Sequence, residues 1–92
     1  MSVFVDPLGF QGMCCWGRAM KSCHMFTDGE ESELHAFADE MGLHRGWCDR
    51  GGAMPHYDLT EGKRIQAIGF GAVEVDRRTT VKIRKQWEER DA

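Results

Sequence analysis

The sequence has little of what a membrane protein or a large enzyme requires. It has only 92 residues, and its longest apolar runs are a few residues, whereas about 20 are needed to cross a bilayer. Its N-terminus lacks the basic start and the apolar stretch of a signal peptide. With 41% hydrophobic and 29% charged residues, the composition is typical of a globular domain and excludes disorder. These features predict a single cytoplasmic domain over residues 1–92, with a small core and no membrane contact.

The sequence also lacks the ligand spacings of a structural zinc site. Neither C-x2-C nor H-x3-H occurs among the four cysteines and four histidines, although such pairs usually place two ligands on one turn. The nearest approach is His44 with Cys48, while Cys23 and His24 would point to opposite faces of a strand. We therefore predict free thiols and no cofactor, and zinc is the alternative.

A phosphate-binding loop is missing as well. Residues 9–17 contain three glycines, but no Lys-Ser or Lys-Thr pair follows them, so the G-x-x-x-x-G-K-[ST] pattern does not occur. We predict a flexible loop in this segment. Its large apolar residues, Phe10, Met13 and Trp16, would offer a surface for another protein if they are exposed.

Hydrophobic periodicity and turn residues predict seven secondary-structure elements. Strands are expected at residues 2–6, 19–26, 56–58 and 72–76, and helices between Asp28 and Gly42, over 61–68 and over 79–89. The order β-β-α-β-α-β-α predicts an α+β fold, a mixed sheet of about four strands with two to three packed helices. The first two strands are expected to be antiparallel. Residues 78–92 are expected to form a basic helix that lies loosely at the edge or reaches a partner.

Local signals specify how the helix near residue 30 is built. Asp28 is a suitable N-cap, and Glu31 follows at the spacing of a capping box. Leu34, Phe37 and Met41 recur on one face, which predicts that they are buried, and Gly42 follows as the residue that ends the helix.

The second half of the chain carries similar signals. Thr60 is expected to cap the next helix, with Ile65 and Ile68 facing the core, and Val73 and Val75 are expected to face inward from the last strand. Thr79 or Thr80 is expected to cap the final helix, whose only apolar edge is formed by Ile83 and Trp87.

Charge is unevenly distributed, although the net charge is only −3. Residues 27–42 contain six acidic and no basic residues, whereas residues 60–85 contain seven basic and three acidic ones. The basic region predicts a patch that binds an acidic or phosphate-bearing partner, composed of Lys63, Arg64, Arg77, Arg78, Lys82 and Lys85. Because the whole chain is acidic, we expect weak or no binding to naked duplex DNA.

A second group of residues has the chemistry of an acid–base or hydrolytic metal site. His56 and Asp58 are two apart, so in a strand their side chains share a face. We expect them to lie in a common concavity with His24 or His35. The helix N-terminus at Thr60, followed by Lys63 and Arg64, could hold a phosphate nearby. The alternative is that these histidine and aspartate side chains form a hydrogen-bonded network with a purely structural role.

Five segments carry a resemblance to a known family: VFVD at 3–6, CHMFTD at 23–28, ELHAFA at 33–38, HYDL at 56–59 and GAVE at 71–74. From Ser2 to about Arg78 the chain resembles a small family known only as a domain of unknown function, met in bacterial chromosomes and tailed-phage genomes. The resemblance implies a small stand-alone domain carried by mobile elements and brings no catalytic assignment. It draws attention to Asp6, His24, Asp28, His35, His56, Tyr57, Asp58, Lys63 and Arg64.

Two functions from different classes follow. The preferred hypothesis is a non-enzymatic, phage- or mobile-element-encoded binding module in the host cytoplasm. It would dock to a host protein or ribonucleoprotein, and one version inhibits a nucleic-acid-directed defence system. The alternative is a small metal-dependent hydrolase that acts on a nucleotide or phosphodiester through His24, His56 and Asp58. The hydrolase requires these three side chains to converge within a few ångströms.

Overall fold

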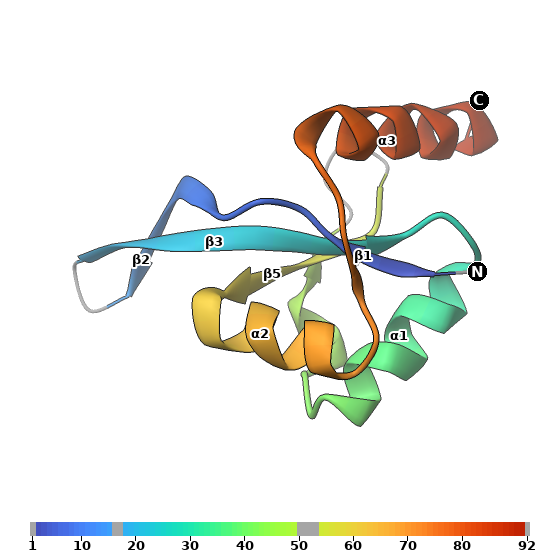
Figure 1. Cartoon of the computed structure of the whole chain (residues 1–92). Helices are drawn as coiled ribbons and strands as arrows, with labels where there is room; N and C mark the ends of the chain where they lie inside the picture. The colour runs from blue at the N-terminus through green and yellow to red at the C-terminus, as the bar shows by residue number, and fades with distance from the viewer. Residues whose placement is uncertain (1, 16–17, 50–53, 92) are drawn as a thin grey trace.

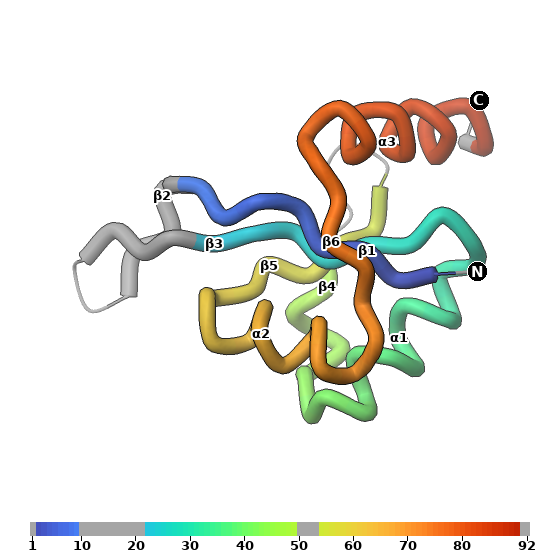
Figure 2. The backbone as a smooth tube through the Cα atoms, in the orientation of Figure 1, coloured from blue at the N-terminus to red at the C-terminus, as the bar shows by residue number. Residues whose placement is uncertain are grey.

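The computed structural model describes residues 2–15, 18–49 and 54–91, with side chains described outside residues 10–21 and 91. The backbone forms a mixed sheet with three α-helices, so the predicted α+β class is confirmed (Figures 1 and 2). The elements are β1 (Val3–Val5), β2 (Gly9–Cys15), β3 (Arg18–Thr27), α1 (Glu31–Glu40), a 3-10 turn η1 (Arg45–Trp47), β4 (Cys48–Asp49), β5 (His56–Thr60), α2 (Glu61–Gly69), β6 (Val73–Glu74) and α3 (Arg77–Asp91).

The long strand β3 organises the sheet. The strand order is β4-β5-β3-β1-β6, with β2 also paired to β3, and only β1 and β6 run parallel. The sheet therefore has six strands in place of about four. One additional strand is the two-residue β4, and the other is β2, where the sequence predicts a loop. Glycines there mark a hairpin with an irregular register instead, and Phe10, Met13 and Trp16 lie outside the residues whose side chains are described.

A bend separates β1 from β2. Val5 pairs with Met25 and Gly9 pairs with Ser22. The chain from β1 to β2 therefore advances four residues while β3 advances three. The extra residue lies between Asp6 and Leu8, and one surplus residue opposite a regular strand is the definition of a β-bulge. Asp6 is the last residue before the irregularity: its N–H donates to the carbonyl of His24 at 3.2 Å, so it lies directly opposite His24 on β3.

Both faces of the sheet are covered. Figure 1 shows α1 and α2 against one face and α3 across the other. Because side chains alternate along a strand, Cys23 and Met25 of β3 contribute to the core with α1 and α2, whereas Phe26 contributes to the core with α3. The first core also contains Val3, Val5, Leu34, Ala38, Met41, Leu43, Tyr57, Leu59, Ala67 and Ala72.

Helix α3 packs on the sheet rather than lying loosely at its edge. Ile83 and Trp87 are buried against Phe26 and Met54, which confirms the apolar edge predicted from their spacing. The indole Nε1 of Trp87 donates to the carbonyl of Thr27 at 2.7 Å. Among the described residues, neither α3 nor any other helix has the length and apolar character that spanning a membrane requires.

The first helix differs from the prediction at its start. It begins at Glu31 with Glu30 as the N-cap residue, which makes no side-chain capping bond, so the assignment of Asp28 as N-cap is wrong. Asp28 instead accepts from the backbone N–H of Ser2 at 3.5 Å. Leu34 and Met41 are buried as predicted, while Phe37 is only half-buried. Gly42 has a φ of +78°, as expected for the glycine that ends a helix.

Three further details correct the prediction. Thr60 caps α2 as expected, but Ile65 is 64% exposed because Ala67, not Ile65, faces the sheet. Val73 is 45% exposed, since β6 is a two-residue strand at the edge. The cap of α3 is Asp76, whose carboxylate accepts from the N–H of Thr79 at 2.8 Å. That bond holds the pKa of Asp76 below its usual value.

The packing of α3 is testable with two matched substitutions on that helix. Ile83→Ala should lower the free energy of unfolding by about 2–5 kcal/mol because it leaves a cavity against the sheet. Val81→Ala removes two methyl groups from a side chain that is 49% exposed and should change it by about 0.5 kcal/mol or less. Urea denaturation followed by circular dichroism measures both, and equal losses would show that α3 does not pack through Ile83.

Candidate metal centre

Three side chains with metal-ligating atoms converge on the sheet face that α3 partly covers. His24 lies on β3 directly opposite Asp58 on β5, and His56 precedes Asp58 by two residues on the same face. One ligand atom from each residue lies within 4.8 Å of the other two. The Nε2 atoms of His24 and His56 are 3.8 Å and 3.7 Å from Oδ1 of Asp58. The sheet therefore brings together the three residues that the spacing argument singles out.

These separations suit ligands of one ion better than hydrogen bonds. A hydrogen bond between nitrogen and oxygen normally spans about 2.7–3.2 Å, so both contacts are too long. A tetrahedral zinc ion with bonds of about 2.0–2.1 Å keeps its ligand atoms roughly 3.3 Å apart. Small side-chain adjustments would close the arrangement around an ion. Two histidines and one carboxylate also form a donor set common in catalytic zinc sites.

The opposite ring nitrogens of both histidines are held by the protein. Nδ1 of His24 lies 2.7 Å from Oδ2 of Asp6, and Nδ1 of His56 lies 2.9 Å from the carbonyl of Met54. A carbonyl can only accept, so Nδ1 of His56 carries the hydrogen and Nε2 of the neutral ring keeps its lone pair. Histidines that bind metals are commonly oriented by such carboxylate or carbonyl partners. Both lone pairs are thereby directed to the side where Asp58 lies.

Asp6 is itself fixed on several sides. Its Oδ1 accepts from the backbone N–H of His24 at 2.7 Å, and its own N–H donates to the carbonyl of His24 at 3.2 Å, so the two residues share three hydrogen bonds. Its own carbonyl accepts from Nε of Arg64 at 3.0 Å, and Arg64 also pairs with Glu74 at 3.1 Å. Only 5% of Asp6 is exposed. The bend between β1 and β2 therefore holds a buried carboxylate behind His24.

The charges around His24 favour its protonated form when no metal is bound. The hydrogen bond to Asp6 raises the pKa of His24 above its usual value near 6.5, and the negative charges of Asp6 and Asp58 act in the same direction. Burial opposes this effect, and so does the positive charge of Arg84. A divalent cation at Nε2 of His24 would take the place of the proton on that nitrogen, because it meets the carboxylate of Asp58 there, while Nδ1 keeps its hydrogen bond to Asp6.

A cavity of about 340 Å³ adjoins the metal centre. His24 and Asp6 form part of its wall, and the first turns of α3 form the rest. Its remaining lining residues are Pro7, Arg77, Thr80, Val81 and Arg84. Two arginines, Arg77 and Arg84, thus line the same cavity as His24. The three-residue centre is accessible from solvent, because the side chain of Asp58 is 39% exposed.

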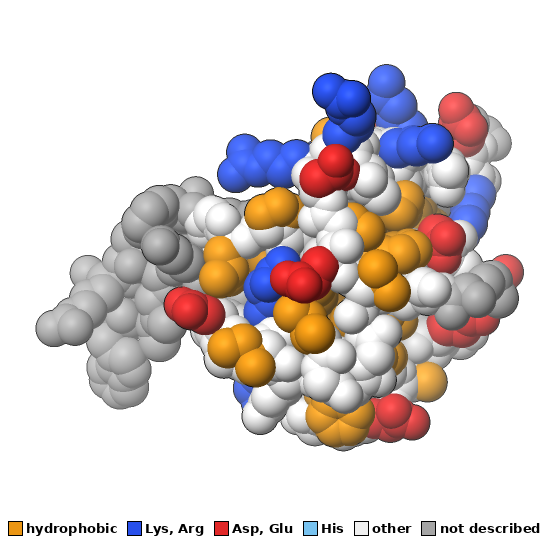
Figure 3. Space-filling model, viewed as in Figure 1, with side chains coloured by type: hydrophobic (Ala, Val, Ile, Leu, Met, Phe, Trp, Pro, Cys, Tyr) orange, Lys and Arg blue, Asp and Glu red, His pale blue; other side chains and the backbone are white. Residues whose placement is uncertain are grey.

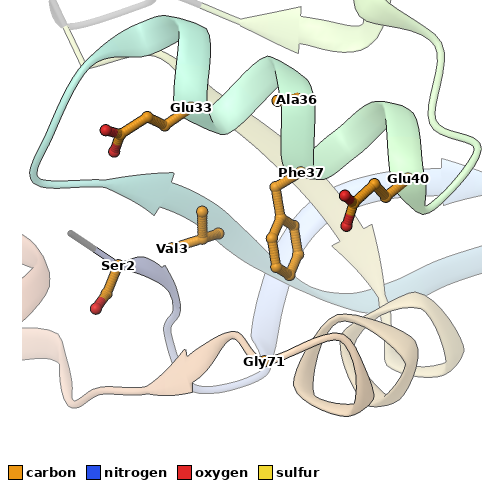
Figure 4. Close-up of a pocket in the computed structure, with 7 residues that line it drawn as sticks. All are labelled: Ser2, Val3, Glu33, Ala36, Phe37, Glu40 and Gly71. Atoms are coloured by element: carbon orange, nitrogen blue, oxygen red, sulfur yellow. The ribbon is translucent and has the colours of Figure 1, made fainter.

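A second cavity, of about 390 Å³, lies on the other side of the sheet (Figure 4). Phe37 points into it from α1 towards the segment around Gly71, and its charged lining residues are Glu33 and Glu40. The remaining lining residues are Ser2, Val3 and Ala36. The His24, His56 and Asp58 side chains do not line it. It therefore lies apart from the metal centre.

Other residues with reactive side chains have structural partners. His35 lies on the α1 side of the sheet, between the hydroxyl of Tyr57 at 2.7 Å and the carboxylate of Glu31 at 2.9 Å, so it is not near the metal centre. Cys23 is fully buried, and burial raises the pKa of its thiol to about 12. Cys23 and Cys48 are free thiols, as predicted, while the side chains of Cys14 and Cys15 lie outside the described residues.

The basic residues do not form the single patch expected from the sequence. Lys63 and Arg64 are on α2, and the sheet separates them from α3 (Figure 1). Arg64 is engaged with Asp6 and Glu74, and Lys63 donates to Gln66 at 3.4 Å. The two basic side chains expected to hold a phosphate near Thr60 therefore lie on the α2 side of the sheet, whereas His56 and Asp58 face the α3 side. Figure 3 shows Lys and Arg side chains gathered over the region that α3 occupies in Figure 1.

Two residues of the site carry roles that the sequence reasoning missed. Asp6 orients His24 from a bend that no local signal marks, apart from Pro7 directly after it. Arg84 is not among the residues of the predicted basic patch, and it is half-buried at the cavity. The spacing of Arg77, Thr80, Val81 and Arg84 at i, i+3, i+4 and i+7 was the available signal, because it places all four on one side of a helix.

Comparison with known proteins gives one family. A family model described as a protein of unknown function, DUF4031, matches residues 3–87. The match spans every residue of the metal centre and of the adjoining cavity, and it extends beyond the limit near Arg78 indicated by the sequence segments. No curated protein and no solved structure matches the chain.

The bond between Asp6 and His24 predicts a specific dependence of stability on pH. Because the pKa of His24 is raised in the folded protein, the pair stabilises the fold fully below about pH 6.5 and loses this contribution as the pH rises through the folded-state pKa. In chelator-treated protein, Asp6→Asn should therefore lower the free energy of unfolding by about 1–3 kcal/mol at pH 6, and by less at pH 9.

Urea denaturation at the two pH values measures this difference, and an NMR titration of the His24 ring should show a lower pKa in the variant. His44→Asn serves as the control, because His44 is an exposed histidine that caps the 3-10 turn. An equal loss of stability at both pH values would contradict a charge-assisted bond.

Proposed function

We propose that this chain, which belongs to the DUF4031 family of proteins of unknown function, is a metal-dependent hydrolase with a single divalent ion held by His24, His56 and Asp58. The convergence of the three donor groups within 4.8 Å carries this proposal. The two backing contacts, from Asp6 to His24 and from Met54 to His56, support it further. A purely structural network would be expected to satisfy the Nε2 atoms with short hydrogen bonds, and those atoms instead face Asp58 at 3.7–3.8 Å.

The ligand set suits hydrolysis. Three protein ligands leave a coordination position for water, and an ion such as Zn²⁺ lowers the pKa of bound water from 15.7 to about 7. His24 and His56 supply neutral nitrogen donors, and Asp58 supplies the negative charge. The polar cavity beside His24 gives a substrate access to this position. The same donors can also bind Fe²⁺, so iron belongs among the ions tested.

Metal binding tests the proposal directly. Tag-free protein treated with chelator is titrated with Zn²⁺, Mn²⁺ and, under exclusion of oxygen, Fe²⁺ in a calorimeter. One ion should bind per chain, and His24→Ala or His56→Ala should weaken binding by about 100-fold or more, because each removes one of three ligands. Asp6→Asn should weaken binding by about 10- to 100-fold, as expected for a group that orients a ligand.

His44→Asn is the matched control, since His44 is exposed and outside the centre. It should bind the ion as tightly as the wild type. Hydrolysis of p-nitrophenyl phosphate and bis(p-nitrophenyl) phosphate by the metal-loaded protein is then compared between His56→Ala and His44→Asn. Undiminished metal binding in the His24 and His56 variants, or activity that survives in them, would refute the proposed centre.

One observation supports the second candidate, the docking module. Arg78, Lys82 and Lys85 are exposed along α3, at the spacing of one helix face. Such a face suits an acidic protein surface or a ribonucleoprotein, because complementary charge accelerates and orients association. Docking does not need the metal centre. Variants of the metal centre and variants of the exposed α3 face therefore distinguish the hydrolase from the docking module.

The docking candidate predicts that Arg78→Glu combined with Lys82→Glu leaves thermal unfolding unchanged, because both side chains are exposed. The double variant should weaken binding to a protein captured from the host cell by at least about tenfold, equal to about 1.4 kcal/mol. The wild-type interaction should also weaken steeply as salt is raised. Glu88→Gln on the same helix is the control. Equal capture by the double variant at physiological salt would show that the face is merely solvated.

A further inference from the structure

The cavity beside the metal centre combines two elements that are distant in the sequence. Asp6 and Pro7 come from the bend between β1 and β2, and Arg77 and Arg84 come from the first two turns of α3. His24 belongs both to the cavity wall and to the metal centre. Any ligand that fills the cavity therefore lies next to the ion proposed above.

Arg77 and Arg84 have no carboxylate within ion-pair distance among the residues that the structure describes, unlike Arg64 with Glu74. Arg84 is half-buried and lines the cavity together with His24. A partly buried guanidinium group that has no counter-charge has lost hydrogen bonds to water. A bound anion can replace these hydrogen bonds. The carboxylates of Asp6 and Asp58 do not supply this charge, because Asp6 is bonded to His24 and Asp58 faces both histidines.

The backbone around the cavity is adapted to Arg77. A Cβ atom added at Gly9 would lie 3.1 Å from Nη2 of Arg77, closer than ordinary contacts allow. The absence of a side chain at Gly9 thus permits the guanidinium group to lie against the start of β2. Arg77 is exposed and reaches the start of β2 with its Nη2 atom, and Arg84 stands two turns further along α3.

We propose that this cavity binds the phosphate group of a small phosphate ester through Arg77 and Arg84, and that this ester is the substrate of the metal centre; the second part rests on the proposed function. Guanidinium groups match the oxygens of phosphate in bidentate geometry. A terminal phosphate carries close to two negative charges, which two arginines and one divalent ion can share. The cavity has a volume of about 340 Å³, which is near the lower end of the range for small-molecule sites, about 300–1,000 Å³.

The cavity therefore favours a phosphomonoester the size of a mononucleotide over a nucleic-acid strand. The reaction is balanced without a redox partner. The water oxygen forms a new bond to phosphorus, the bond between phosphorus and the ester oxygen breaks, and a proton from the water ends on the leaving oxygen. Inorganic phosphate and an alcohol are the products. Arg77 and Arg84 would hold the phosphoryl oxygens on which negative charge is concentrated.

Phosphate binding can be measured independently of the metal. Inorganic phosphate is titrated into chelator-treated protein and into Zn²⁺-loaded protein, with binding followed by calorimetry and by the NMR signals of the arginine Nε–H groups. Arg84→Gln and Arg77→Gln should each weaken phosphate binding by at least about tenfold in both forms. Lys82→Gln removes the same charge from an exposed position on α3 outside the cavity and should change the affinity by less than about twofold.

Activity distinguishes the two ester classes. The metal-loaded wild type should hydrolyse p-nitrophenyl phosphate and 5′-AMP faster than bis(p-nitrophenyl) phosphate, and Arg84→Gln should raise KM for the monoesters. Faster hydrolysis of the diester would overturn the assignment to a monoester. Equal phosphate binding in Arg84→Gln and Lys82→Gln would overturn the phosphate site itself.

The outcomes separate this inference from the proposed function. If Zn²⁺ binds through His24 and His56 while the arginine variants leave phosphate binding unchanged, the metal centre stands and the phosphate site is wrong. If phosphate binds in the cavity of chelator-treated protein while no divalent ion binds, the phosphate site stands and the proposed hydrolase is wrong. Arg84→Gln and Arg77→Gln should bind Zn²⁺ as the wild type does, since neither residue belongs to the three ligands.

Discussion

The two hydrogen bonds that the carboxylate of Asp6 makes with His24 are the constraint on which the site depends. One bond fixes the backbone of β3 beside the bend, and the other fixes the imidazole ring of His24. The bend exists because the edge formed by β1 and β2 has one residue more than β3 can pair with. Asp6 is the last residue in register with β3 before this surplus residue, and its N–H donates to the carbonyl of His24 at 3.2 Å. Its carboxylate accepts the N–H of His24, which a regular antiparallel pair would donate to the Asp6 carbonyl. Arg64 secures the same bend from the opposite face through the carbonyl of Asp6.

Alternation along β3 and β5 lets one thin sheet serve both the core and the site. Met25 and Tyr57 face α1 and α2, while the neighbouring residues His24 and His56 face the side of α3. The apolar half of this second face is covered by Ile83 and Trp87, and the polar half remains accessible next to it. A domain of this size has little surface to spare for a deep cleft. The site lies instead where the cover of α3 over the sheet ends, so a polar surface next to a cavity forms without a second domain.

Several parts of the structure follow from short-range patterns in the sequence, and others do not. The apolar spacing of Leu34 and Met41 and the alternation in β3 were sufficient to place α1 and the central strand. The two-residue spacing of His56 and Asp58 likewise placed both on one face. By contrast, the role of Asp6 depends on its cross-strand pairing with His24, a residue eighteen positions away in the sequence. The hairpin strand β2 was missed because its glycines indicate a loop, and its pairing with β3 is decided by the whole sheet.

Helix α3 shows how a short sequence can carry three separate faces. Ile83 and Trp87 face the sheet, Arg77 and Arg84 face the cavity, and Arg78, Lys82 and Lys85 face outward. The acidic residues of α1 lie on the opposite side of the sheet. The molecule is therefore dipolar, and an approaching anion is attracted towards the α3 side and repelled from the α1 side. Because the outward basic residues adjoin the cavity arginines on one helix, the same field that would favour an acidic partner also concentrates small anions at the entrance to the metal centre.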